Sequence, residues 1–183
     1  MQSVTEQSAP YFKRGLGFII LLMALDQLSK WWVLEVFDLP AKGSVEILPF
    51  FSLTMVWNTG ISMGLALGDA LGRWGIVVMT AGISIWLVFW LKRSTRAFEA
   101  SALVLILSGA IGNLIDRFVH GAVVDFLHFY AYTYSFYVFN VADSAITTGV
   151  IMLLIDGLRD GGKSPKKASN NGQDEAGRQG ESS

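Results

Sequence analysis

The chain has 183 residues, of which 52% are hydrophobic and only 16% are charged, with a net charge of −1 and no cysteine. A soluble domain is about one quarter charged, so this chain has too few polar groups to cover its surface in water. The near-zero net charge excludes a basic nucleic-acid footprint, and the lack of cysteine excludes disulfide frameworks, thiolate metal sites and cysteine nucleophiles.

Four apolar stretches are long enough to cross a bilayer as helices, which takes about 20 residues each. They cover residues 15–37, 71–91, 97–115 and 136–158. No small-residue cleavage site follows the first stretch, so we interpret it as an uncleaved anchor rather than a secretory signal. We therefore predict a mostly α-helical membrane protein with four transmembrane helices.

Lysine and arginine predict how these spans are oriented. Most of them lie before the first span, between the second and third, or after the fourth: Lys13, Arg14, Lys92, Arg93, Arg96, Arg159, Lys163, Lys166, Lys167 and Arg178. By the positive-inside rule these segments are cytoplasmic, as are both termini. The loops 38–70 and 117–135 then face outward. Residues 1–158 form one domain, and the polar segment 159–183 is expected to be a disordered cytoplasmic tail.

The first span carries two charged residues, Asp26 and Lys30. Each charge inside a bilayer costs roughly 2.5–3.5 kcal/mol on insertion scales. Residues four apart share one helix face and can pair. The two residues either form a structural ion pair that stabilises helix packing or contact a substrate directly.

The first outer loop contains a predicted strand. In residues 51–58 the Phe, Leu, Met and Trp side chains fall on one face of a strand, and Asn58-Thr59-Gly60 is typical of a turn. The following Gly60-Ile61-Ser62-Met63-Gly64 fits the nucleophile motif of serine hydrolases, with His120 or His128 as a base. That mechanism is disfavoured, because its fold needs several parallel strands for which four spans leave no room.

The third span ends at Asp116-Arg117, at the outer interface. These residues either form a helix-end pair whose arginine reaches headgroups, or Arg117 binds a backbone or carboxylate group with two hydrogen bonds. Residues 123–130 are β-branched and aromatic, which favours a second strand. Aromatic residues continue to Tyr137, so we expect a small β-element on the outer leaflet.

Two aspartates stand out near this outer surface. Asp143 lies about seven residues into the fourth predicted span, roughly 10 Å below its outer end, with Asn140 one turn away. It either lines a polar cavity or bonds a neighbouring helix. Asp125 interrupts an apolar run, and the alternative for it is an exposed loop aspartate. A short loop joins the two elements, so the carboxylates can meet.

Paired carboxylates support acid–base chemistry. At about 4 Å their repulsion is near 4 kcal/mol at an effective dielectric of 20, so one of Asp125 and Asp143 would keep a proton near neutral pH. The ionised carboxylate can take a proton from water, and the protonated one can bond a scissile carbonyl oxygen. No metal or cofactor is needed.

Five motifs in order give a resemblance that covers residues 15–158. They are Asp26-Gln27-Leu28-Ser29-Lys30, Trp57-Asn58-Thr59-Gly60, Gly112-Asn113-Leu114-Ile115-Asp116-Arg117, Val124-Asp125-Phe126 and Phe139-Asn140-Val141-Ala142-Asp143. The chain resembles the lipoprotein signal peptidase (signal peptidase II) family. The resemblance implies a monomeric aspartyl endopeptidase of the bacterial inner membrane, with four spans and a periplasmic β-cradle. It would remove signal peptides from diacylglyceryl-modified prolipoproteins, cutting just before the lipidated cysteine.

The resemblance also implies roles for individual residues. Asp125 and Asp143 match the catalytic aspartates, with Asp26 and Lys30 in support. The substrate-binding residues would be Asn58, Gly60, Asn113, Arg117 and Asn140. Membrane lipids and inhibitors of the globomycin type are implied as partners, whereas nucleic acid, metal and cofactor are not. Many members have Phe where Met63 stands, which alters a contact of the outer loop and not the chemistry.

A non-enzymatic alternative remains open at this point. Asp26, Lys30 and Asp143 could form a proton or ion path in a small transporter. Only the peptidase predicts that uncleaved lipidated precursor accumulates when Asp125 or Asp143 is replaced.

Overall fold

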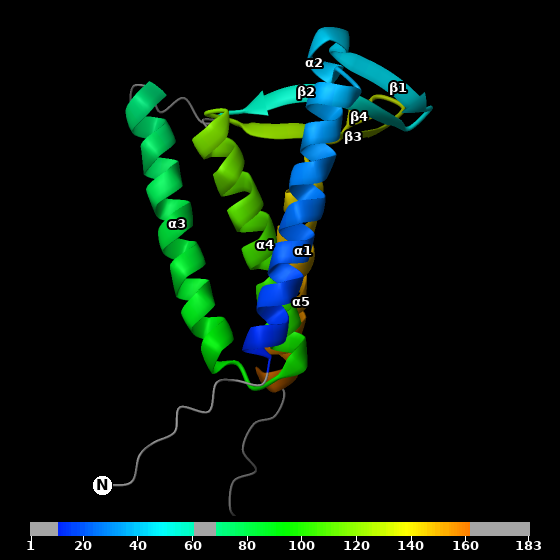
Figure 1. Cartoon of the computed structure of the whole chain (residues 1–183). Helices are drawn as coiled ribbons and strands as arrows, with labels where there is room; N and C mark the ends of the chain where they lie inside the picture. Colours follow the sequence, from blue (N-terminus) through cyan, green and yellow to red (C-terminus); the bar gives the residue numbers. More distant parts are fainter. Residues whose placement is uncertain (1–10, 61–68, 162–183) are drawn as a thin grey trace, which may run out of the picture.

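Four long helices form the body of the protein in a computed structural model that describes residues 11–60 and 69–161. Each is long and apolar enough to cross a membrane, which confirms the four predicted spans (Figure 1). The helices are α1 (Phe12–Trp31), which continues as a π-helical turn (Trp32–Val36), α3 (Asp69–Arg93), α4 (Ala97–Val119) and α5 (Val141–Gly161). A short helix, α2 (Leu39–Lys42), follows the first span.

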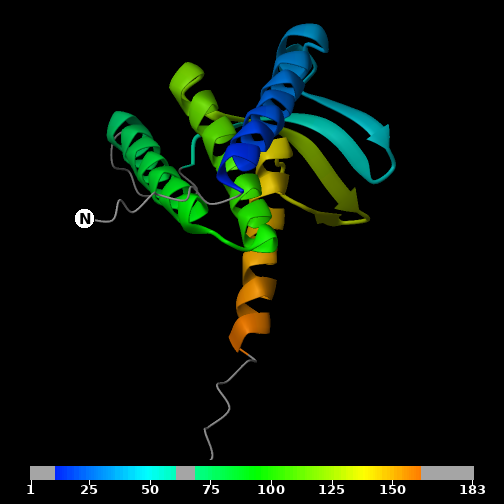
Figure 2. The same cartoon turned by 60° about the horizontal axis from the view of Figure 1, so that its bottom comes forward.

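Helix α4 lies at the centre of the bundle and contacts α1, α3 and α5. Figure 2 shows this arrangement with the lower end of Figure 1 tilted forward. Glycines let α4 and α5 approach closely: a side chain at Gly109 would overlap the backbone carbonyl of Ala142, and one at Gly149 would lie 2.6 Å from that of Ala102. Close approach of this kind drives helix association in lipid. The core between the spans consists mainly of Ile19, Leu87, Leu91, Leu103 and Leu107.

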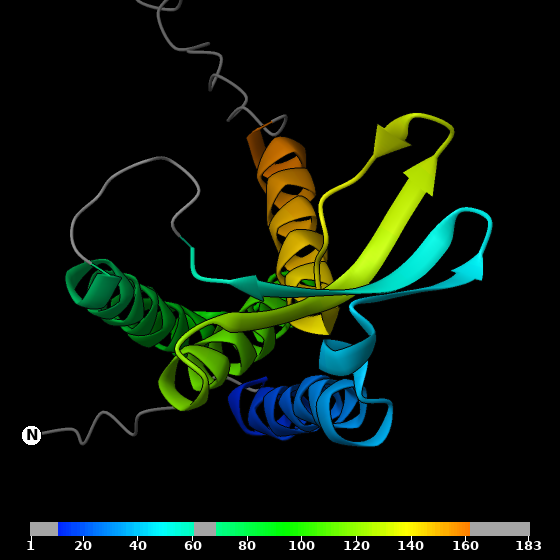
Figure 3. The ribbon, with the colours of Figure 1, turned by 90° about the horizontal axis from the view of Figure 1, so that it is seen from above.

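A four-stranded antiparallel sheet lies across one end of the bundle (Figures 1 and 3). Its strands, in spatial order, are β1 (Ser44–Leu48), β2 (Phe51–Asn58), β3 (Val123–Ala131) and β4 (Tyr134–Ser135). The two predicted strands are confirmed as β2 and β3, and the short edge strands β1 and β4 were not predicted. Val33, Leu39, Leu53, Val124 and Phe126 form a second core where the sheet meets the helices.

The fourth span starts later than the sequence predicted. The backbone of Phe139 pairs with Leu127 of β3 in both directions, at 2.7 and 3.0 Å, so this segment is extended and α5 begins only at Val141. Asp143 therefore lies in the first turn of α5 and not two turns inside the span. The later start of α5 places this carboxylate at a helix N-terminus, beside the sheet.

Two further span ends differ in detail. Helix α4 continues to Val119, so Asp116 and Arg117 belong to its last turns. Helix α5 continues to Gly161, so the first residues of the predicted tail are helical, and the rest of the tail lies outside the described residues. The expectations for Ser62 and Met63 also fall outside them.

Candidate active site

Asp125 is held in β3 by two amide side chains. Nδ2 of Asn58, at the end of β2, donates to Oδ2 of Asp125 at 2.9 Å, and Nδ2 of Asn140 donates to Oδ1 at 2.7 Å. The antiparallel register pairs Asn58 with Val123 and Val56 with Asp125, which brings the end of β2 beside this carboxyl group. Asp125 is 1% exposed, so it is a buried carboxyl group and not a solvated loop aspartate.

Asp143 is held at the N-terminus of α5. Nδ2 of Asn113, from α4, donates to Oδ1 of Asp143 at 2.8 Å. The backbone N–H of Asn140 donates to Oδ2 of Asp143 at 3.3 Å, and the backbone N–H of Asp143 donates to Oδ1 of Asn140 at 2.9 Å. This reciprocal pair resembles a capping box, and the helix N-terminus favours negative charge on Asp143.

Asn140 joins the two aspartates in one network. Its side chain is fully buried and donates to Asp125. Its backbone N–H donates to the carboxylate of Asp143, and its Oδ1 accepts the backbone N–H of Asp143. Nδ2 of Asn140 also donates to Oδ1 of Asn113 at 3.1 Å, and Nδ2 of Asn113 in turn donates to Asp143. The structure therefore brings the two aspartates singled out in the sequence to a common site.

Burial changes the acidity of this site. Removal from water raises the pKa of Asp125 from 3.8 to about 6, and the negative charge of Asp143 adds to the effect. The hydrogen bonds from Asn58 and Asn140 lower the pKa and offset part of the rise. Asp125 therefore holds a proton in mildly acidic solution.

Beneath the aspartates lies a buried cluster of three charges. Nζ of Lys30 is 2.8 Å from Oδ2 of Asp26 and 2.7 Å from Oδ2 of Asp116, and it donates to Oδ1 of Asn113 at 3.1 Å. The predicted pair of Asp26 and Lys30 is present. Asp116 is the third member of the cluster and was not predicted from the sequence, which placed this residue beside Arg117 at the outer interface.

The charge cluster bonds the backbone next to each aspartate of the site. Oδ1 of Asp26 accepts the N–H of Ala142 at 3.0 Å, and Oδ2 of Asp116 accepts the N–H of Val124 at 3.2 Å. Ala142 and Val124 directly precede Asp143 and Asp125 in the chain. Lys30, by pairing with both carboxylates, therefore fixes the positions of α5 and β3 relative to each other.

Gln27 also contacts the charge cluster, a role that was not predicted for it. Its Nε2 donates to Oδ1 of Asp116 at 2.9 Å and to the carbonyl of Gly112 at 3.2 Å. The sequence offered two signals for it, a polar side chain inside an apolar span and a place in the first of the five motifs. Gln27 orients Asp116, so that the other oxygen of this carboxylate faces Lys30 and Val124.

A pocket of about 430 Å³ opens beside Asp125. Residues 56–60 of β2 and its turn line one side, and Tyr137 and Val138 line another. Gly60 has a positive φ of 76°, and its N–H donates to Oδ1 of Asn58 at 2.9 Å, which aims the amide of Asn58 at Asp125. The turn thus lines the pocket and also orients the amide group that bonds Asp125.

Arg117 lies close to this turn. A side chain at Gly60 would come within 3.7 Å of Nη2 of Arg117, while Nη1 donates to the carbonyl of Asn113 at 3.3 Å. Nε of Arg117 is buried and has no hydrogen-bond partner among the described residues. A buried guanidinium with a free donor can bind a carbonyl group of a ligand.

Neither histidine belongs to this network. The ring of His128 bonds Ser52, Thr54 and Ser135 on the sheet, and the ring of His120 lies against Trp57. Within residues 11–60 and 69–161, no group of three or more His, Cys, Asp or Glu side chains is arranged to hold a metal ion. The groups that the described residues bring together at the site are two carboxyl groups, amide donors and one guanidinium.

Comparisons with known proteins identify the family to which this chain is similar. The family model described as "Signal peptidase (SPase) II" matches residues 18–159. A lipoprotein signal peptidase of Nitrobacter hamburgensis is 45% identical over 149 residues, 79% of this chain and 91% of the relative. One of Methylorubrum extorquens is 42% identical over 90% of this chain and 98% of the relative.

Two solved structures, both described as bacterial membrane enzymes, share the fold. One is 29% identical, with a TM-score of 0.72, over 92% of this chain and 97% of its own. The other is 30% identical, with a TM-score of 0.73, over 84% and 97%.

Proposed function

This chain belongs to the signal peptidase II family of membrane proteases, and we propose that it cleaves signal peptides from prolipoproteins by an aspartic mechanism. The observation that carries the aspartic assignment is the buried network in which Asn140 bonds both Asp125 and Asp143. Two carboxyl groups held in this way provide the acid and the base that peptide hydrolysis requires.

In the proposed reaction, Asp143 is the base and Asp125 carries the proton. Asp143 removes a proton from water, whose oxygen forms a bond to the scissile carbonyl carbon. Asp125 donates its proton to the carbonyl oxygen. When the tetrahedral intermediate collapses, the C–N bond breaks, the leaving nitrogen takes the proton held by Asp143, and Asp125 recovers its own. The helix N-terminus at Asp143 and the raised pKa of Asp125 support this division of roles.

Three groups around the pocket are proposed to bind the substrate backbone. Arg117 has a free buried Nε, and Asn58 and Gly60 form the turn that lines the pocket. Asn113 and Asn140 would keep the carboxyl groups aligned while the peptide binds. These assignments follow the resemblance in sequence, and the position of each residue within the network supports them.

The proposed substrate is a precursor whose cysteine carries a diacylglyceryl group. The sheet packs directly on the ends of the spans, so the pocket lies near the depth at which a lipid backbone meets water. An acyl-anchored cysteine would hold its neighbouring peptide bond at that depth. Cleavage is then expected just before the modified cysteine.

The protein is a multi-pass membrane protein, and we propose that it lies in the bacterial inner membrane with its pocket on the outer side. Basic residues at the start of α1, at the α3–α4 connection and at the end of α5 all lie at the end opposite the sheet (Figure 1). The positive-inside rule makes that end cytoplasmic. We further propose a single domain that acts as a monomer and binds inhibitors of the globomycin type. The transporter alternative finds no support in the comparisons.

The decisive experiment uses two synthetic precursors of the same sequence, one with a diacylglyceryl cysteine and one without. The purified full-length protein is incubated with each, and the products are identified by mass. We expect a single cut before the cysteine in the lipidated precursor only. Equal cleavage of both precursors would contradict the proposed substrate, and no cleavage of either would contradict the proposed activity.

A further inference from the structure

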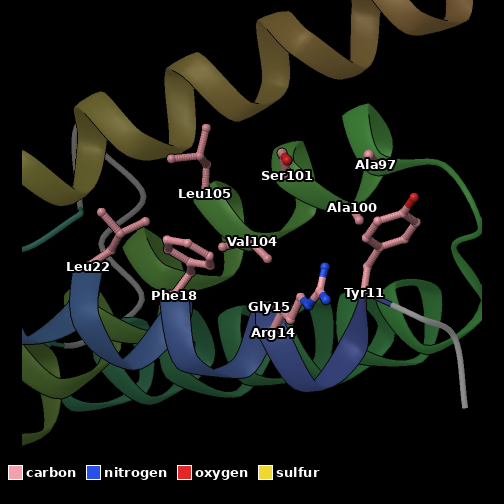
Figure 4. A pocket seen from close by; sticks show the side chains of 10 residues that line it. All are labelled: Tyr11, Arg14, Gly15, Phe18, Leu22, Ala97, Ala100, Ser101, Val104 and Leu105. Atoms are coloured by element: carbon pink, nitrogen blue, oxygen red, sulfur yellow. The ribbon is translucent and has the colours of Figure 1, made fainter.

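A groove lies between α1 and α4, at the end of the bundle opposite the sheet. It encloses about 340 Å³, and Figure 4 shows apolar side chains along it, among them Phe18, Leu22, Val104 and Leu105. Gly15 lets the helices approach here, since a side chain at this position would lie 3.0 Å from Cγ2 of Val104. From Arg14 to Leu22 the groove follows α1 for roughly 12 Å, enough for much of one acyl chain.

One end of this groove is polar and cationic. Arg14 and Tyr11 line it and extend from α1 toward α4 (Figure 4). Within the part of the chain that the structure describes, the guanidinium of Arg14 makes no hydrogen bond or ion pair, although it lies at a mouth of an apolar groove. Lys13 directly precedes Arg14 on α1 and does not line the groove.

Two acidic residues at this end of the bundle, Asp156 and Glu99, are already bonded. Asp156 accepts from Nη2 of Arg96 at 2.6 Å. Glu99 accepts from Nε1 of Trp90 at 2.8 Å and from Oγ of Ser94 at 2.7 Å. Neither of them pairs with Arg14, so among the described residues the groove combines an apolar channel with a cation that has no ion-pair partner.

We propose that this groove binds one anionic phospholipid, with an acyl chain along α1 and α4 and the phosphate at Arg14. Basic sites between spans on the cytoplasmic side favour anionic headgroups. The other apolar ligand at hand, a signal peptide, carries a basic segment at its cytoplasmic end, which Arg14 and Lys13 would repel. The proposal concerns the end of the bundle away from Asp125 and Asp143 and does not depend on their chemistry.

The test is native mass spectrometry of the delipidated full-length protein with phosphatidylglycerol or phosphatidylcholine of identical acyl chains. We expect one phosphatidylglycerol to be retained several-fold more than phosphatidylcholine. Arg14→Gln should abolish this preference, whereas Lys13→Gln, which removes the same charge outside the groove, should keep it. Equal loss in both variants would mean diffuse attraction to a basic surface and would overturn the proposal.

A second pair of variants tests the apolar part. Ser101 lines the groove and is exposed, so Ser101→Trp should fill it and reduce retention of either lipid. Thr147 is an exposed residue of α5, and Thr147→Trp adds the same bulk elsewhere without effect. Both variants should still cleave lipidated precursor, which shows that they fold.

Cross-linking identifies the place and the occupant without relying on a variant. Phosphatidylglycerol with a photoreactive acyl chain should label residues 11–22 and 97–105 in the wild type. Free glycerol 3-phosphate should not compete, because it lacks the chain. Labelling spread evenly over all four spans, or displacement of the lipid by the precursor peptide, would overturn the proposal.

Discussion

Nζ of Lys30 lies 2.7 Å from a carboxylate oxygen of Asp116, so an ion pair joins α1 to α4 where both residues are buried. The same ammonium group contacts Asp26. Since Asp26 bonds the N–H before Asp143 and Asp116 bonds the N–H before Asp125, this single cation supports the geometry of both aspartates.

We predict that Lys30→Ala is strongly destabilising. It leaves Asp26 and Asp116 buried without a cation, and removing one partner of a buried ion pair typically costs about 3–5 kcal/mol. Asp116→Asn should cost less, because it leaves a neutral pair of Lys30 and Asp26. Thermal unfolding in detergent measures the order, and a lower unfolding temperature for Asp116→Asn than for Lys30→Ala would contradict it.

The cluster also predicts how stability can be recovered. Replacing Asp26 by Asn and Lys30 by Met still leaves Asp116 charged and buried. Adding Asp116→Asn removes the last charge, so the triple variant should unfold at a higher temperature than this double variant. A double variant that equals the triple one would show that Asp116 is compensated by another group.

We predict that Asp125→Asn and Asp143→Asn each reduce cleavage of lipidated precursor by roughly 10²–10⁴-fold, the usual contribution of a general acid or base. Asparagine keeps the shape of aspartate, so both variants should remain folded. Asp156→Asn is the matched control, since Asp156 is a buried carboxylate on the same helix as Asp143 that bonds Arg96. Substantial turnover in either variant would exclude that aspartate from the mechanism.

The serine alternative is tested separately. Ser62→Ala should retain full turnover, because the proposed chemistry uses no serine nucleophile. Mass analysis of the same lipidated precursor measures this. A folded but inactive Ser62→Ala protein would restore the serine mechanism.

Activity is predicted to depend on pH through Asp125. The active form carries a proton on Asp125, whose pKa is raised to about 6, so kcat/KM should fall as the pH rises above about 6. Asn58→Ala removes a hydrogen bond that lowers this pKa, so it should move the decline to higher pH. The measurement is a pH profile of kcat/KM, and a rate that increases through pH 6 would exchange the roles of the two aspartates.

The same pKa shift has a consequence for stability. The folded protein binds the Asp125 proton more tightly than the unfolded chain, whose carboxyl group has a pKa near 3.8. The stabilisation is complete below about pH 4 and is lost as the pH rises through about 6. Asp125→Asn should abolish this part of the pH dependence of unfolding.

Gly60→Ala is predicted to impair activity more than stability. A left-handed backbone costs a residue with a side chain about 1–2 kcal/mol, and the new Cβ would lie 2.7 Å from Cδ1 of Ile76. Any shift of the turn also moves the N–H that orients Asn58 toward Asp125. The control is Gly75→Ala, where a Cβ meets nothing within 4 Å. Equal effects of both changes on turnover would show that the turn geometry is unimportant.

The sequence by itself determined the spans and the central strands, because both follow from local composition. A helix that crosses lipid needs a long apolar run, and the Phe, Leu, Met and Trp residues of β2 recur at every second position, as on one face of a strand. The sequence also singled out Asp125 and Asp143 as unpaired charges in apolar surroundings. The pairing of Lys30 with Asp26 was predictable as well, since residues four apart on a helix share a face.

Only the tertiary structure decided how these parts meet. Asp116 turns toward Lys30 of another span, the pairing of Phe139 with Leu127 delays the start of α5, and Asn140 bonds both aspartates. The physical reason is that a buried polar group must find a hydrogen-bond partner wherever the packing places one. That partner is set by the close approach of α4 to α1 and α5, and a contact between residues far apart in the chain leaves no periodic signal in the sequence.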